Sequence, residues 1–280
     1  MLVALIESSM TGFDTMVSDA VGILTDTSYS GTLWVTVRSL SDNLKPFCNI
    51  IVGICLLIEL ANVAAKVDII RWEHGLKIGV KACLAKASID IAPTFLLACY
   101  RQAQLWITNI NSGTTITFGS ETARALRTLV DSVSGIGNIL GLFVSVFIVI
   151  LAVKICGLMI KVIAYGRIFE IYVYLVVSPL PCAFFPLGNG DGGGVSRITT
   201  KFLKSFIAVC LQGVMMIVVI FVFDKIMGTF LTSAISAAAT NTDANAAITD
   251  LIYNMLLGSV ALVMAIVKCG SWAKGIIDAM

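Results

Sequence analysis

Residues 170–194 read EIYVYLVVSPLPCAFFPLGNGDGGG, a stretch that joins an apolar run to residues that break helices. The 17 residues from 171 to 187 carry no charge, and three of them are prolines. Five glycines follow between residues 188 and 194. A membrane-spanning helix needs roughly 20 predominantly apolar residues, whereas a proline inside a helix removes a backbone donor and costs about 3 kcal/mol. The stretch therefore predicts a membrane segment that its prolines kink or interrupt.

The composition of the whole chain is typical of a membrane protein. Of the 280 residues, 58% are hydrophobic and 13% are charged, and the mean hydropathy is +0.96. A soluble domain is typically about 45–50% apolar and about 25% charged, so a soluble fold of this length could not hide so much apolar surface. The net charge of +2 gives no basic excess that would favour a broad surface for nucleic acids.

Apolar runs of membrane length recur along the chain. A run at 76–100 is doubtful because it holds Lys77, Lys81, Lys86 and Asp90, and charges are costly inside a bilayer. We therefore predict an all-α, polytopic helical membrane protein with about five transmembrane helices, interfacial amphipathic helices and one proline-broken segment. The five runs that qualify or come close are 47–65, 136–153 (or on to 163), 171–187, 205–223 and 251–267.

The distribution of basic residues predicts the orientation. If residues 76–100 lie at the membrane surface, the segments 66–135, 188–204 and 268–280 share one side and carry 13 of the 19 Lys and Arg residues. If all six runs crossed the membrane, the basic residues would divide almost evenly between the two sides. Because short cytoplasmic loops carry the excess of basic residues, the five-span arrangement is favoured, with the N-terminus outside and the C-terminus inside.

This arrangement divides the chain into four parts. Residues 1–46 form an extracytoplasmic N-terminal arm with an amphipathic helix, and 47–65 form the first transmembrane helix. Residues 66–135 form an amphipathic or interfacial region at the cytoplasmic face, where an i, i+3, i+4, i+7 pattern of apolar residues begins at Leu126. Residues 136–280 form a membrane core of four spans.

The residue types on which metal sites and nucleophilic catalysis depend are sparse. His74 is the single histidine, and the eight cysteines include no C-x-x-C pair and lie in or beside apolar runs. Gly188, Gly190 and Gly193 match G-x-G-x-x-G, but that motif indicates dinucleotide binding only between a strand and a helix. We therefore expect no enzymatic activity, no metal and no cofactor.

Pro179 and Pro181 need a structural context in which a broken helix is tolerated. Inside a membrane, backbone groups that a break sets free must find partners in the protein or in a wet cavity. One interpretation is a kinked or re-entrant segment inside an assembly, where neighbouring subunits or a lumen supply those partners. The other interpretation is an ordinary kinked span whose prolines lie near its end.

Two polar residues lie deep in the apolar runs and are candidates for packing or for lining a pore. Glu59, in the first run, either pairs with a lysine such as Lys86 or Lys154 or lines a lumen. Gln212, in the fourth run, is expected to form a hydrogen bond between helices.

The sequence RIFEIYVYLVVSPLPCAFF at 167–185 is followed, after a short loop, by KFLKSFIAVCLQGVMMIVVIFVF at 201–223. Over about residues 160–225 the chain closely resembles the central region of TrbL-like conjugal transfer proteins. These are polytopic inner-membrane channel subunits of type IV secretion systems, and the chain is most similar to the versions in Gram-positive conjugative elements. The matching features are Arg167 and Glu170 before the span, the break at Pro179 and Pro181, the Lys204-Ser205-Phe206 entry to the next span, and Gln212-Gly213 within it.

The resemblance implies a structural channel subunit of a bacterial conjugation machine, with several spans in the cytoplasmic membrane. Such proteins form ring homo-oligomers beside secretion ATPases and other type IV secretion subunits, among membrane lipids, and help to form the path for single-stranded DNA and attached protein. A non-conducting membrane scaffold and a secondary transporter are the alternatives. Basic residues that would line the path, or else anchor helices at lipid headgroups, are Lys154, Lys161, Arg167, Arg197, Lys201 and Lys204.

Overall fold

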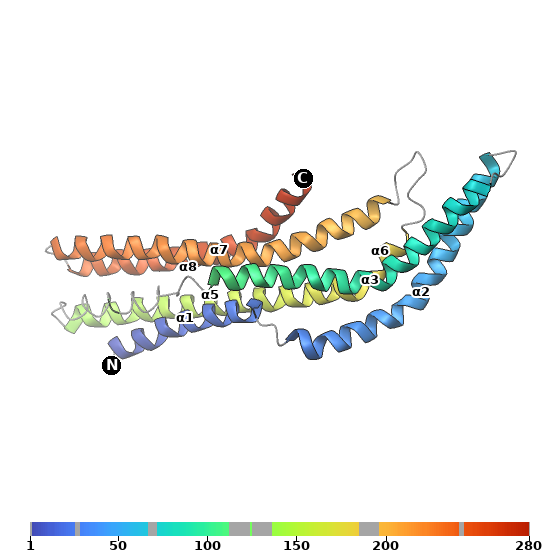
Figure 1. Ribbon diagram of the computed structural model, residues 1–280. Helices are drawn as coiled ribbons and strands as arrows, with labels where there is room; N and C mark the ends of the chain where they lie inside the picture. Colours follow the sequence, from blue (N-terminus) through green and yellow to red (C-terminus); the bar gives the residue numbers. More distant parts are fainter. Residues whose placement is uncertain are drawn as a thin grey trace. The chain divides into compact units, whose positions relative to one another are not determined.

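The computed structural model describes residues 2–25, 29–66, 72–111, 124, 136–184, 196–240 and 244–279. Within these ranges the chain is helical, apart from turn residues at Ser178 and Phe184. The chain divides into two compact units, each of which is described by itself. The helices, labelled in Figure 1, are α1 (Leu2–Thr25), α2 (Tyr29–Lys66), α3 (Trp72–Asn111), α5 (Ile136–Val177), α6 (Pro179–Ala183), α7 (Ser196–Thr240) and α8 (Ala244–Ala279).

Five stretches of these helices are long and apolar enough, by length and composition, to cross a membrane. They contain 27–37 residues each, which at a rise of about 1.5 Å per residue is about 40–55 Å, longer than the roughly 30 Å hydrocarbon core of a bilayer. The prediction of an all-α membrane protein with about five spanning helices is therefore confirmed. The five candidate spans are Leu33–Asn62, Ile78–Asn111, Phe147–Ala183, Ile198–Phe230 and Tyr253–Ala279.

The predicted runs 136–153 and 171–187 do not form two separate spans, and this part of the prediction is wrong. Both runs fall on α5 and α6, which together contain one candidate span, Phe147–Ala183. Charged residues between the runs, such as Lys154 and Lys161, lowered the local hydropathy. They do not end a helix, because lysine is a good helix former and α5 contains no proline.

The doubtful run 76–100 lies in α3, within the candidate span Ile78–Asn111. The number of five spans therefore agrees with the sequence, but the five segments are not the same five. Pro93 lies inside α3, as Pro46 lies inside α2, and both helices continue past their prolines. An interfacial position for 76–100 stays a prediction.

Unit 1 comprises Met1–Thr25, Trp106–Arg167 and Gln212–Trp272. In this unit α1 packs against α5 at Gly157, where an added Cβ would lie 3.2 Å from Phe13 Cδ2. α7 packs against α8 at Gly258, where a Cβ would overlap the side chain of Met227. Small residues at these two positions therefore allow the helix backbones to approach closely, as is common between membrane helices.

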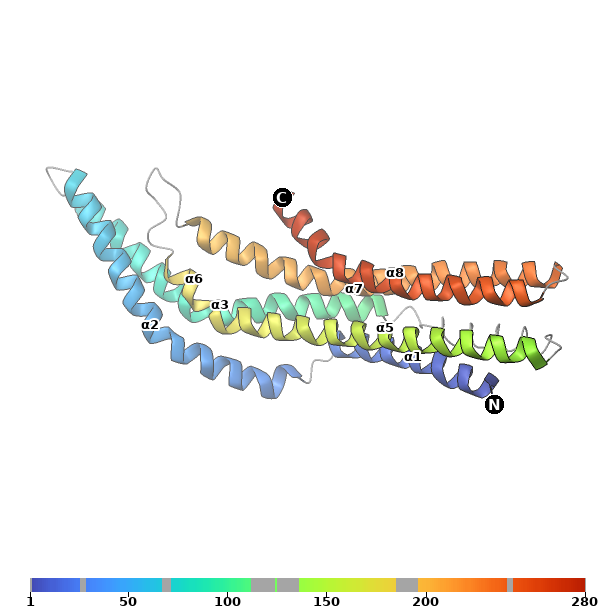
Figure 2. The ribbon, with the colours of Figure 1, turned by 180° about the vertical axis from the view of Figure 1, so that it is seen from behind.

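Unit 2 comprises Asp26–Leu105, Ile168–Leu211 and Ala273–Met280. Here α2 and the first part of α3 run side by side in opposite directions, and α6 packs against α2 (Figure 2). The unit has a buried cluster to which all three helices contribute. Its members are Cys48 and Val52 from α2, Ala85 and Ile89 from α3, and Ala183 from α6.

Candidate functional site

Glu59 on α2 is paired with Lys81 on α3. The distance from Lys81 Nζ to Glu59 Oε1 is 2.6 Å, and each side chain is 14% exposed. The sequence predicted a lysine partner such as Lys86 or Lys154, and the structure places Lys81 there instead. Because α2 and α3 are antiparallel, Lys86 lies further along the hairpin, where its Nζ donates to Asn49 Oδ1 at 3.2 Å.

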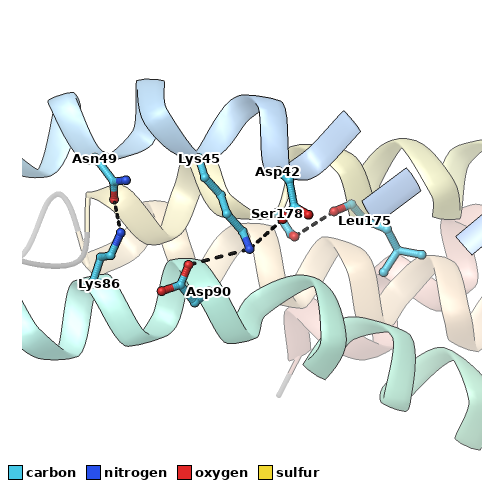
Figure 3. Close-up of polar contacts among 7 residues, drawn as sticks. All are labelled: Asp42, Lys45, Asn49, Lys86, Asp90, Leu175 and Ser178. Atoms are coloured by element: carbon cyan, nitrogen blue, oxygen red, sulfur yellow. Dashed lines mark hydrogen bonds and ion pairs between the residues drawn. The ribbon is translucent and has the colours of Figure 1, made fainter. Parts of the chain in front are cut away.

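A second ion cluster lies along the same interface, nearer the start of α2. Lys45 Nζ lies 2.8 Å from Asp42 Oδ1 on its own helix and 3.7 Å from Asp90 Oδ1 on α3 (Figure 3). Together with the contacts of Lys86 and Lys81, these groups form a polar seam between the two helices. We use the name α2–α3 seam for the residues Asp42, Lys45, Asn49, Glu59, Lys81, Lys86 and Asp90.

The α2–α3 seam supplies partners for charged residues that made 76–100 a doubtful span. Lys81, Lys86 and Asp90 each contact a polar partner on α2. An unpaired charge is expensive in a medium of low dielectric constant, whereas a paired and hydrogen-bonded charge is tolerated. Beside α2, therefore, α3 is far more compatible with a membrane than its sequence alone indicates.

The break between α5 and α6 is compensated in part within the chain. Pro179 has no N–H group to bond the carbonyl of Leu175, four residues before it. The hydroxyl of Ser178 donates to Leu175 O at 2.8 Å and takes the place of that bond (Figure 3). Ser178 itself keeps a helical backbone, with φ −52° and ψ −32°, so the chain continues from α5 into α6 with one missing backbone bond replaced by a side chain.

The end of α6 is held by α7. Thr199 Oγ1, in the first turn of α7, donates to Pro181 O at 2.8 Å, and Phe184 N approaches the same oxygen at 3.4 Å. The sequence raised the prospect that neighbouring subunits or a lumen would satisfy the broken helix. For the carbonyls of Leu175 and Pro181, residues of the same chain already supply the donors.

Gln212 lies in α7 and is 2% exposed. Its amide contacts α8 at Gly270, where an added Cβ would be 2.8 Å from Gln212 Nε2. That nitrogen has no hydrogen-bond partner among the described residues. Gln212 therefore lies against α8, and a hydrogen bond between helices through this residue stays a prediction.

Sequence reasoning missed a buried carboxylate in the same helix. Asp224 is 4% exposed and lies in the candidate span Ile198–Phe230, one residue beyond the predicted run. Its Oδ2 is 3.5 Å from Nζ of the neighbouring Lys225, whose side chain is exposed. The signal was present: Gln212, Met216, Ile220 and Asp224 follow at intervals of four, and all are buried.

Three of the predicted basic residues are at least partly exposed. Lys154 and Lys201 are exposed, and Lys204 is half-buried. No ion pair involves these three lysines within the part of the chain that the structure describes. Lys154 lies on an otherwise apolar exposed face of α5, between Leu151 and Leu158.

The other three predicted basic residues have different surroundings. Lys161 Nζ lies 2.6 Å from Asp19 Oδ2 and so ties α5 to α1. Arg167 is half-buried and has an interaction partner. Arg197 is in the first turn of α7, and its side chain lies outside the described residues. The structure therefore separates Lys154 and Lys201 from the residues that have a packing or pairing role.

The sequence matches the TrbL/VirB6 plasmid conjugal transfer like protein family over residues 14–179, which is more than half of the chain. The matched region contains the α2–α3 seam and ends at Pro179, so it overlaps the sequence resemblance noted at 160–225 only in part. Comparisons with curated proteins and with solved structures found no match. The chain therefore belongs to the TrbL/VirB6 family of plasmid conjugal transfer like proteins.

Proposed function

We propose that the chain is a channel subunit of a bacterial conjugation or type IV secretion machine, of the type found in Gram-positive conjugative elements. Family membership indicates a membrane component of such a machine. In the proposal, several copies form a ring in the cytoplasmic membrane and line part of the path for single-stranded DNA and attached protein. Partner ATPases supply the energy, and this chain supplies the structure.

The observation that carries the proposal is the family match over 14–179, together with five helices of membrane length. These helices present large apolar side chains on their outer surfaces, for example Leu57 on α2 and Phe169 on α5, at 67% and 68% exposed. Such surfaces need lipid or neighbouring subunits around them. A structural role in a membrane assembly is consistent with both features.

Lys154 is the residue that best supports a conducting role. It is exposed on α5 in a helix stretch of mean hydropathy 2.5. A lysine that faced lipid at this position would be costly, because charged side chains in spans normally face a bundle interior or a water-filled cavity. A path that carries DNA offers both water and phosphate groups to this ammonium group.

Donor cells that lack the gene provide the test. They are complemented with the wild-type chain, with Lys154→Gln, or with Lys154→Arg, which keeps the charge. A channel subunit should crosslink to the transferred strand in wild-type cells, and Lys154→Gln should lower both this crosslinking and the conjugation frequency while membrane levels stay normal. Lys154→Arg should restore both, because any water-filled path accepts either cation.

The alternatives give different results in the same cells. A non-conducting scaffold would be needed for transfer but would give no crosslink to DNA, although other secretion subunits would. A secondary transporter would leave the conjugation frequency unchanged when the gene is deleted. Either result would contradict the proposed channel role.

A further inference from the structure

Unit 2 contains an apolar cavity of about 350 Å³ between α3, α6 and α7. Its walls come from one face of α3, from the proline-broken α6 and from the first turns of α7. The volume is within the range of about 300–1,000 Å³ that is typical of small-molecule sites. Among the side chains that line it are Leu84, Ile91 and Phe95 of α3, Cys182 of α6, and Phe202 and Leu203 of α7.

The cavity offers almost no polar groups to an occupant. The described residues that line it include no charged side chain, and the two hydroxyl groups present are already engaged with the backbone. Ser88 Oγ donates to Ala85 O at 2.8 Å, and Thr199 Oγ1 donates to Pro181 O at 2.8 Å. Apolar cavities of this kind stay free of water and take apolar ligands.

The cavity is open at the side of α3. Leu84, Ile91 and Phe95 line it and are each more than half exposed. The walls belong to the candidate spans Ile78–Asn111, Phe147–Ala183 and Ile198–Phe230. In a membrane this opening faces the hydrocarbon of the bilayer, so the apolar ligand that is present at the highest concentration is an acyl chain.

The length of the cavity fits one leaflet. Its lining on α3 extends from Leu84 to Leu96, which corresponds to about 18 Å along a helix axis, and half of the hydrocarbon core of a bilayer is about 15 Å thick. The lining residues Cys182 and Thr199 lie at the end of one candidate span and at the start of the next. The cavity therefore lies in the leaflet on the side of the α6–α7 connection.

We propose that this cavity binds one acyl chain of a membrane phospholipid and holds it more tightly than the surrounding lipid. The chain lies along α3 and fills the space beside Cys182 and Phe202. Occupancy stabilises α6 in its place between α3 and α7. The inference depends on α3 crossing the membrane and not on the proposed passage of DNA, so either can fail without the other.

The test uses the full-length protein, reconstituted in vesicles of phosphatidylcholine and phosphatidylglycerol that contain a phospholipid with a photoreactive diazirine on its acyl chain. After transfer to mild detergent and washing, native mass spectrometry should detect about one retained phospholipid per chain, since surrounding lipid is lost. Illumination of the washed sample should then give crosslinks at the lining residues, such as Ile91 and Phe202, rather than at Thr94 or Ala98, which are exposed on α3 outside the cavity.

Two alanines on α3 provide a matched pair of variants. Ala87 lines the cavity and Ala98 does not, and both are exposed. Ala87→Phe should abolish the retained lipid and the crosslinks at the lining residues, whereas Ala98→Phe should preserve both. If Ala87→Phe does not fold, the wild-type crosslink map still decides the question. Equal crosslinking of the lining residues and of Ala98, or the absence of a retained phospholipid, would overturn the proposal.

Discussion

At the scale of single residues, Glu59 shows how a carboxylate is accommodated on an apolar helix. Its position in the first apolar run made it a candidate for a lumen or for an ion pair, and the structure places it 2.6 Å from Lys81 Nζ. Both side chains are largely buried, and each gives the other a polar partner in surroundings where a lone charge would be costly. We therefore propose that the pair has a structural role in joining α2 to α3.

We predict that Glu59→Leu lowers the stability of the purified protein by about 3 kcal/mol, because it leaves Lys81 without its counter-charge in a poorly solvated position. The quantity to measure is the free energy of unfolding in detergent. The double variant Glu59→Leu with Lys81→Leu should recover most of the loss, because it removes both charges. The exposed Asp278→Leu is the control. Additive effects of the two single variants would show that Glu59 and Lys81 are not coupled.

At the scale of secondary-structure elements, the junction of α5 and α6 shows how a helix passes two prolines. Ser178 donates to the carbonyl that Pro179 leaves without a donor, and Thr199 donates to the carbonyl of Pro181. The backbone at Ser178 keeps helical angles, and at this junction a side-chain hydroxyl replaces a backbone donor. The hydroxyl group of Ser178 therefore stabilises the start of α6, and the hydroxyl group of Thr199 stabilises its end.

This exchange predicts that a second substitution corrects the first. Ser178→Ala should lower stability by about 1–2 kcal/mol, because it leaves a buried carbonyl without a donor. Pro179→Ala in the same chain should restore it, since alanine returns a backbone N–H to Leu175 O in a helical conformation. Thermal unfolding of the single and double variants measures the effect. If the double variant is less stable than Ser178→Ala, the hydroxyl group does not replace the missing backbone bond.

At the scale of the whole molecule, the set of five helices changes the membrane topology that the sequence predicts. If each of the five candidate spans crosses once, the segment between α3 and α5 lies on the side of the N-terminus. The segments between α2 and α3 and between α6 and α7 lie on the other side. Basic residues flank these last two segments and still favour an inner position for them: Lys66, Arg71, Lys77, Arg197, Lys201 and Lys204.

Single cysteines on a cysteine-free background distinguish the two topologies. With α3 as a span, Ser120→Cys should react with a membrane-impermeant maleimide in intact cells, and Gly193→Cys should react only after permeabilisation. With α3 at the inner surface and α5–α6 as a single span, the pattern reverses: Ser120→Cys should be protected until the membrane is opened, and Gly193→Cys should react in intact cells. Labelling of both positions from outside would contradict both arrangements.

The sequence by itself determined the class of protein, because the length and composition of apolar runs are properties of neighbouring residues. It also pointed to the right family through the residues around Pro179 and Pro181, although the family match lies mostly before them. Hydropathy correctly indicated five spans, but it counted Lys81, Lys86 and Asp90 against α3 and divided α5 at its charged residues. A mean hydropathy gives every charged residue the full cost of transfer into the membrane, whether or not that residue has a partner on another helix.

Only the tertiary structure shows that Lys81, Lys86 and Asp90 have polar partners on α2. Lys81 bonds Glu59, which is 22 positions away in the sequence, and Lys86 bonds Asn49, which is 37 positions away. Thr199 likewise reaches Pro181 O across 18 positions. The cost of a polar group in a membrane depends on its partner, and a partner on another helix is set by how the helices pack. The α2–α3 seam, the compensated break at α6 and the apolar cavity beside it all depend on that packing.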